Sequence, residues 1–292
     1  MLVTPALALS LAAALGWSTY DLLRKLLTGR VAALPLVALI TLGALLPLAA
    51  WTAFVGDWRI GSGYLLPGLA SVALNVAANL AFFRSLQLAP MSVTLPLLSL
   101  TPVFTAVLAL LLLGESLGGR QVAGIALVVV GALAINLQPG EGLLPRTLIR
   151  AALRERGSQL MAFVALCWSA TLLLDKRALL HAAPTLHAFV LHAGVAAGAL
   201  AMLAARRELA TLKVPAGVLG LLVATVLCGA VTVTVQLMAI QSMAVALVET
   251  LKRGLGATLA LVWGRAFFGE PLPLHRVVAV ATMVGGVVLL LA

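Results

Sequence analysis

Three charged residues lie inside an apolar stretch near the end of the chain. Glu249, Lys252 and Arg253 fall about two turns into a segment that runs from Met243 to Trp263. A charge at the centre of a membrane helix costs about 2.5–3.5 kcal/mol on insertion scales, and charges in that position usually have a function. On a helix, Glu249 shares a face with both basic residues and can pair with one of them, so a second cation remains for another role.

Two interpretations of this second cation follow. In the first it faces a central cavity and binds a carboxylate or phosphate group of a substrate, for which the planar guanidinium of Arg253 is better suited than the ammonium of Lys252. In the second, the three residues form a closed ion network with another helix, or the basic pair reaches an interface of the membrane. We favour the first. We also consider, as a less favoured hypothesis, that Glu249 takes up a proton and so couples transport to a proton gradient.

Other polar side chains lie in the apolar segment from Tyr64 to Gln87. Arg84 is near its end, and no acidic residue lies in that segment, so Arg84 either contacts a substrate or extends to the interface. Asn75 and Asn79 are one turn apart on one helical face. They can hydrogen-bond a substrate or a neighbouring helix.

Two tryptophans lie within their apolar segments. Trp17 and Trp168 are not at the ends, so the usual preference of tryptophan for the membrane interface explains them poorly. We expect them to line a cavity or to pack in the core. Both belong to a stretch that occurs twice, because Ala14–Lys25 matches Ala165–Lys176 with Trp-Ser and the final Lys in register. The chain is therefore predicted to be a duplication.

The composition is that of a membrane protein. Hydrophobic residues make up 63% of the chain and charged residues 10%, and the mean hydropathy is +1.16, whereas about a quarter of the residues of a soluble domain are charged. The formal net charge is +10, but the basic residues separate apolar runs and form no patch with aromatic residues. This pattern argues against nucleic-acid binding. The two cysteines have no metal-ligand spacing, and we expect no metal or cofactor.

Ten apolar segments approach the roughly 20 residues that a spanning helix requires. They are Ala6–Leu23, Ala33–Val55, Tyr64–Gln87, Ser92–Leu113, Gln121–Leu137, Gln159–Leu180, Pro184–Leu203, Ala216–Ile240, Met243–Trp263 and Leu274–Leu291. Five segments per half make the two halves an inverted pair, an architecture typical of transporters. We expect a first repeat at 1–137, a basic linker at 138–157 and a second repeat at 158–292.

The orientation is predicted from basic residues. The connections after the first, fifth, seventh and ninth segments hold twelve Lys and Arg residues, and those after the second, fourth and sixth hold four. Because Lys and Arg concentrate on the cytoplasmic side, this count places both termini outside the cytoplasm.

The motifs resemble the EamA domain of the drug/metabolite transporter superfamily over essentially the whole chain. They are Trp17-Ser18 with a basic residue seven positions on, its copy at Trp168, and the Gly-Glu pairs at Gly114 and Gly269 that close the fourth and ninth helices. The resemblance implies an all-α, ten-helix bundle of two inverted five-helix repeats and transport of small metabolites, such as amino acids, without a cofactor. It also implies cytoplasmic termini, against the charge count. The charged trio of the ninth helix resembles one branch of EamA proteins.

We therefore expect a secondary active or facilitative transporter in the inner (cytoplasmic) membrane that works by alternating access, with efflux slightly favoured. Its partners would be a small-molecule substrate, the lipid bilayer and, as coupling ion, protons; a monomer is sufficient. One alternative is a lipid or lipid-phosphate flippase, in which Lys252, Arg253 and Arg84 bind a headgroup. Another is an intramembrane enzyme acting on lipid-linked substrates, but no catalytic motif supports an enzyme.

Overall fold

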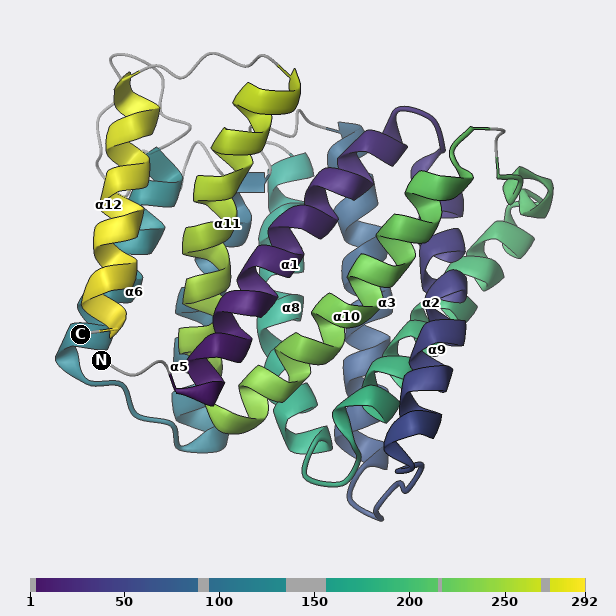
Figure 1. The fold of residues 1–292 in the computed structure, drawn as a ribbon, viewed down its shortest axis with the longest axis horizontal. Coiled ribbons are helices and arrows are strands. Elements are labelled where there is room, and N and C mark those ends of the chain that lie inside the picture. Colours follow the sequence, from purple (N-terminus) through teal and green to yellow (C-terminus); the bar gives the residue numbers. More distant parts are fainter. Residues whose placement is uncertain (1–3, 89–94, 135–155, 215–216, 269–273, 292) are drawn as a thin grey trace. The chain divides into compact units, whose positions relative to one another are not determined.

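The computed structural model describes residues 4–88, 95–134, 156–214, 217–268 and 274–291, and those residues contain ten α-helices, two short 3-10 helices and no strand (Figure 1). The helices are α1 Pro5–Thr28, α2 Ala33–Val55, α3 Leu65–Leu88, η1 Leu95–Leu100, α5 Thr101–Leu113, α6 Gly119–Ala134, α8 Arg156–Ala178, α9 Pro184–Ala205, η2 Leu209–Thr211, α10 Leu219–Ser242, α11 Val245–Phe268 and α12 Leu274–Leu291. The predicted all-α fold class is confirmed.

Six of the ten described α-helices have the length and composition of membrane spans. Within the described residues, six are long and apolar enough to cross a bilayer, namely α1, α2, α3, α8, α9 and α10, and shorter apolar stretches lie in α5, α6 and α12. Large apolar side chains such as Leu46, Phe54 and Leu66 are exposed on their surfaces. Such exposure is unfavourable in water and suits lipid, which supports a polytopic membrane protein.

Helix ends coincide with the residues that favour them. Thr4 caps α1, because its side-chain oxygen accepts a hydrogen bond from the backbone N–H of Leu7 at 3.3 Å, and Pro5 follows as the first helical residue. Gly56 and Gly114 end α2 and α5 with φ of 76° and 68°. Only glycine adopts these angles without strain, so both helices stop there.

The fourth predicted segment differs from the expected single helix. It is divided into η1 and α5, and its first residues, 92–94, lie outside the described part of the chain. Pro102 in the first turn of α5 has no N–H to donate to the carbonyl of Leu98. The hydroxyl of Thr101 donates to that carbonyl instead. The proline therefore ends the 3-10 turn and starts the α-helix.

The chain forms two compact units, each made of pieces from both halves of the sequence. The first unit comprises Met1–Val76 and Leu174–Met243, and the second comprises Ala77–Leu173 and Ala244–Ala292. Helices α3 and α8 contribute to both. The proposed division into repeats follows the order of helices along the chain and stays a prediction. Most of the predicted basic linker, residues 138–155, lies outside the described residues.

In the first unit, α1 packs against α10, and α2 packs against α9. Ala38, near the start of α2, lies in a buried apolar cluster with Ala199 and Leu203, near the end of α9. These two helices hold the same place in the two predicted repeats, and they run antiparallel. Equivalent helices of an inverted duplication must do so.

In the second unit, α5 packs against α11, and α6 lies beside α12 (Figure 1). Gly286 of α12 lies so close to α6 that an added Cβ would be 2.8 Å from the carbonyl oxygen of Gly124 and 2.9 Å from Cβ of Leu127. Gly131, further along α6, faces Ala279 and Met283, nearer the start of α12. The equivalent helices α6 and α12 are thus also antiparallel.

Candidate functional site

The charged trio on α11 forms a compact ion cluster in the second unit. The carboxylate of Glu249 is 1% exposed, and its Oε1 accepts a hydrogen bond from Nε of Arg253 at 2.8 Å. Its Oε2 pairs with the ammonium of Lys252. The prediction that Glu249 pairs with only one of the two cations is wrong, because each oxygen of the carboxylate faces a different cation.

The ion cluster of Glu249, Lys252 and Arg253 carries a formal charge of +1, because two cations share one carboxylate. Its basic side chains are 12% exposed at Lys252 and 20% exposed at Arg253. The positive charge is therefore held at an apolar location but retains some surface. Such a group attracts anions more strongly than it would in water, since the local dielectric constant is low.

A second helix supports the guanidinium of Arg253. Nη2 of Arg253 donates to the hydroxyl of Thr101 on α5 at 3.5 Å, and the hydroxyl of Ser169 on α8 donates to the carbonyl oxygen of Thr101 at 3.1 Å. The neighbour of Ser169 is Trp168, whose ring lies 5.5 Å from the ring of Phe82 on α3. The repeated Trp-Ser pair thus contributes Ser169 to the surroundings of the ion cluster.

Two further predicted site residues, Asn79 and Arg84, lie on α3 close to Phe82 in the sequence. Asn79 is partly buried and Arg84 is exposed, on either side of Phe82 along the helix. Both make contacts within the chain. The exposure of Arg84 is consistent with a side chain that reaches the interface as well as with a substrate contact.

The remaining two predicted residues, Trp17 and Asn75, belong to the first unit. The ring of Trp17 packs edge-on against the ring of Tyr20 at 5.7 Å, and the guanidinium of Arg24 lies 4.4 Å from the centre of that tyrosine ring. Asn75 donates to the carbonyl oxygen of Ser71 on its own helix at 3.2 Å. Six of the eight predicted residues are therefore in the second unit and two in the first.

A buried polar group in the first unit is not among the predicted site residues. The hydroxyl of Tyr64 lies 2.8 Å from Nδ1 of His187, and Nε2 of His187 lies 3.0 Å from Oδ1 of Asp175. The hydroxyl of Ser71 donates to the same Oδ1. These four residues, which we call the buried relay, are all less than 5% exposed. Its signal in the sequence is Asp175, one acidic residue near the end of an apolar segment.

The phenol of Tyr64 keeps its proton in this setting. Tyr64 lies just before α3, and burial together with the carboxylate of Asp175 raises the pKa of its hydroxyl. The side chain is therefore a hydrogen-bond donor or acceptor throughout the physiological range, never a phenolate.

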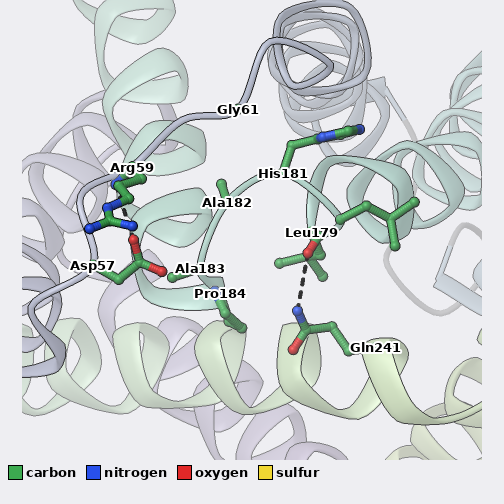
Figure 2. Close-up of a pocket in the computed structure, with 10 residues that line it drawn as sticks. Asp57, Arg59, Gly61, Leu179, His181, Ala182, Ala183, Pro184 and Gln241 are labelled. Atoms are coloured by element: carbon green, nitrogen blue, oxygen red, sulfur yellow. Dashed lines mark hydrogen bonds between the residues drawn. The ribbon is translucent and has the colours of Figure 1, made fainter.

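A cavity of about 550 Å³ opens beside the buried relay, at the ends of α2, α8 and α10 (Figure 2). Asp57 and Arg59 line one side, where the backbone N–H of Arg59 donates to the carboxylate of Asp57 at 3.1 Å. On another side, the amide of Gln241 donates to the carbonyl oxygen of Leu179 at 3.2 Å. The lining is polar enough to hold water.

Among the described residues, no group of three or more His, Cys, Asp or Glu side chains is placed to hold a metal ion.

Comparisons with known proteins identify the fold and the family. The model of the EamA-like transporter family matches residues 4–137 and 156–292. A solved structure described only as a crystal structure of protein superposes with a TM-score of 0.74 at 22% sequence identity, over 97% of this chain and 95% of that chain. At that identity the match supports the fold alone. No curated protein matches the chain.

Proposed function

The chain belongs to the EamA-like transporter family, and we propose that it carries a small metabolite with a carboxylate or phosphate group across the membrane by alternating access. We place the protein in the inner membrane and infer efflux as the direction of transport, by analogy with other members of its family. The family match itself supports a membrane protein of a transporter family.

The observation that supports an anionic substrate is the net charge of the ion cluster. Lys252 and Arg253 share the carboxylate of Glu249, which leaves +1 on a membrane helix. One negative charge on the substrate brings the cluster to zero, and a neutral assembly is far cheaper to bury than a charged one. Charge balance thus favours a group with a single negative charge, such as a carboxylate.

The proposed roles differ among the residues. Arg253 supplies planar donors that match an oxyanion, Lys252 adds a point charge, and Glu249 keeps the empty cluster from carrying +2. In the same unit we propose Trp168, Asn79 and Arg84 as further substrate contacts. Trp17 and Asn75 are proposed contacts in the first unit.

Glu249 is a poor carrier for a coupling proton. Its carboxylate is bonded to both cations of the cluster. Protonating it would remove the only negative charge of the trio and leave +2 at a buried position, which costs free energy.

Uptake into proteoliposomes tests this function. A panel of amino acids, organic anions and phosphorylated metabolites would be offered to the native protein and to the Arg253→Ala and Lys252→Ala variants. We expect an anionic solute to be transported and Arg253→Ala to reduce its uptake by at least about tenfold, because a charge-assisted pair is lost. Arg265→Ala is the matched control, since Arg265 is an exposed residue in the last turn of the same helix. Equal transport by all variants would reject the ion cluster as the anchor.

A further inference from the structure

The two ring nitrogens of His187 have partners in the buried relay in two protonation states. In the first, the hydroxyl of Tyr64 donates to Nδ1 of His187, and Nε2–H of His187 donates to the carboxylate of Asp175. The hydroxyl of Ser71 donates to the same carboxylate. No donor in this arrangement faces another donor. The Asp175–His187 pair then carries a formal charge of −1.

One added proton changes the charge of the pair while the ring nitrogens of His187 keep the same partners. If Nδ1 of His187 gains the proton, it donates to the oxygen of Tyr64, and the hydroxyl hydrogen of Tyr64 must turn away from the imidazole. The contact between Nε2 and Asp175, which is 3.0 Å in the structure, then becomes an ion pair. The pair is then neutral overall, with imidazolium and carboxylate bonded to each other. A neutral pair is less costly in an apolar interior than a net −1 charge.

The cavity lies one hydrogen-bonded turn from the relay on two sides. The carbonyl oxygen of Gly61, which lines the cavity, accepts from the backbone N–H of Tyr64 at 3.0 Å. The carbonyl oxygen of Ala183, also in the lining, accepts from the backbone N–H of His187 at 2.9 Å. The cavity thus reaches the backbone turns that carry Tyr64 and His187, whose own side chains are buried.

Other charged and titratable groups occur on the surrounding elements. Lys176 donates to the carbonyl oxygen of Met243 at 2.9 Å, so its ammonium is directed to the end of α10. Nδ1 of His192 lies 2.8 Å from the carbonyl oxygen of Ala188 on its own helix. The remaining groups are Asp57 and Arg59 between α2 and α3, Arg177 in the last turn of α8, and His181 between α8 and α9.

We propose that Asp175 and His187 form a proton-binding site that exchanges one proton with water through the cavity, and that this proton is coupled to solute movement. The charged, proton-free pair favours a conformation in which water reaches it, and the neutral, proton-loaded pair permits closure. A proton thus shifts the population between conformations, as any ligand with unequal affinity for two states does. The coupling rests on the proposed transport function, whereas proton binding does not.

Proton binding is tested without any substrate by nitrogen-15 magnetic resonance of histidine-labelled protein in lipid bilayers, titrated from about pH 4 to about pH 10. The chain has four histidines, and His187→Gln assigns the signals of His187. We expect both ring nitrogens of His187 to move from the neutral to the charged pattern within this range. Signals that keep the neutral pattern throughout would overturn the proposal.

Two variants are expected to shift this titration in opposite directions. Asp175→Asn removes the negative charge beside the imidazole and should lower its proton affinity at least about tenfold. Ser71→Ala removes a donor to the carboxylate and should raise the proton affinity of the pair at least about threefold. Asp57→Asn, in the cavity wall, is the matched control and should shift it less than about twofold. Ser71→Ala keeps the test decisive if Asp175→Asn does not fold, and shifts of the same sign would contradict the proposal.

Coupling is tested with a pH gradient across proteoliposomes and the solutes of the transport panel. His187→Gln should reduce gradient-driven accumulation at least about tenfold, because the group that binds the proton is missing. Exchange of labelled for unlabelled solute at equal pH should fall as well, because Asp175 then stays charged and disfavours closure. Asp175→Asn, in which the pair is neutral without an added proton, should retain that exchange. Full gradient-driven accumulation by His187→Gln would refute coupling. If the native protein moved no solute, the transport function would fail, and the titration of His187 would still decide the proton site.

Discussion

The carboxylate of Glu249 should be one of the largest single contributors to stability in the second unit, and Glu249→Gln tests this. The side chain is 1% exposed and accepts from Arg253 at 2.8 Å while pairing with Lys252 through its other oxygen. Glutamine preserves the shape but removes the charge, so α11 would hold two cations without a carboxylate. The NH2 group of the glutamine would also take the place of one carboxylate oxygen, so a hydrogen-bond donor would face one of the two cations.

The size of the effect follows from these contacts. Each hydrogen bond to a charged group contributes about 1.5–3 kcal/mol, and the amide oxygen of glutamine can replace only one of the two bonds, with a neutral acceptor. Removing one partner of a buried ion pair costs about 3–5 kcal/mol in general. We therefore expect the free energy of unfolding to fall by about 3–5 kcal/mol, since the two cations are at most 20% exposed.

The assay is reversible unfolding in mixed detergent micelles, followed by the circular dichroism of the helices. The double variant Glu249→Gln with Lys252→Met restores the net charge of the cluster to +1 and should recover at least about half of the lost free energy. A loss below about 1 kcal/mol for Glu249→Gln, or no recovery in the double variant, would refute the view that this carboxylate holds the two cations in the membrane.

Three further predictions concern packing, capping and the support of the site. Gly286→Ala should lower the free energy of unfolding by about 1–3 kcal/mol, because an added Cβ would lie 2.8 Å from the α6 backbone. Gly285→Ala should change the free energy of unfolding little in the same assay, because no neighbouring atom of the described residues lies within 4 Å of its added Cβ. Glu115→Ala should cost about 0.5–2 kcal/mol, because the carboxylate accepts from the first N–H of α11 at 3.1 Å; unfolding unchanged from the native protein would argue against this cap. Thr101→Val should raise the KM for an anionic solute about 3- to 10-fold, because it removes the hydroxyl that accepts from Arg253. Thr105→Val should not raise the KM, because the hydroxyl of Thr105 has no hydrogen-bond partner in the described part of the chain. Equal KM values for the two variants would show that the bond to the guanidinium is dispensable.

The positions of the helices were predictable from the sequence, because lipid requires apolar segments of a fixed length whose backbone groups bond internally. The segments Ala33–Val55 and Leu274–Leu291 coincide with α2 and α12. The division of the fourth segment was harder to predict. It depends on the carbonyl oxygen of Leu98, to which Pro102 has no N–H to donate and to which the hydroxyl of Thr101 donates instead. A hydropathy pattern does not detect such a change.

The site was predictable only where its contacts are local. Spacing of three and four residues placed Glu249 beside both basic residues, but it did not show that each carboxylate oxygen takes one cation. The contact of Arg253 with Thr101 joins residues 152 positions apart and depends on how α5 and α11 pack. One sequence gives no direct signal for such a contact.

The buried relay shows the same limit. His187 lies only 12 positions after Asp175, but the two side chains meet because the turn between α8 and α9 reverses the chain. The partners of His187 lie on two other elements, so they could not be inferred from its neighbours in the sequence.

The most direct test of the ion cluster as an anion anchor compares a transported carboxylate solute with its uncharged methyl ester. The native protein should prefer the acid by at least about 30-fold in competition for uptake, since a close charge pair of this kind contributes about 2 kcal/mol or more. Arg253→Ala should reduce this preference to within about threefold, while Arg265→Ala should retain it. An undiminished preference in the Arg253→Ala variant would contradict the account, because the negative charge would then be recognised elsewhere.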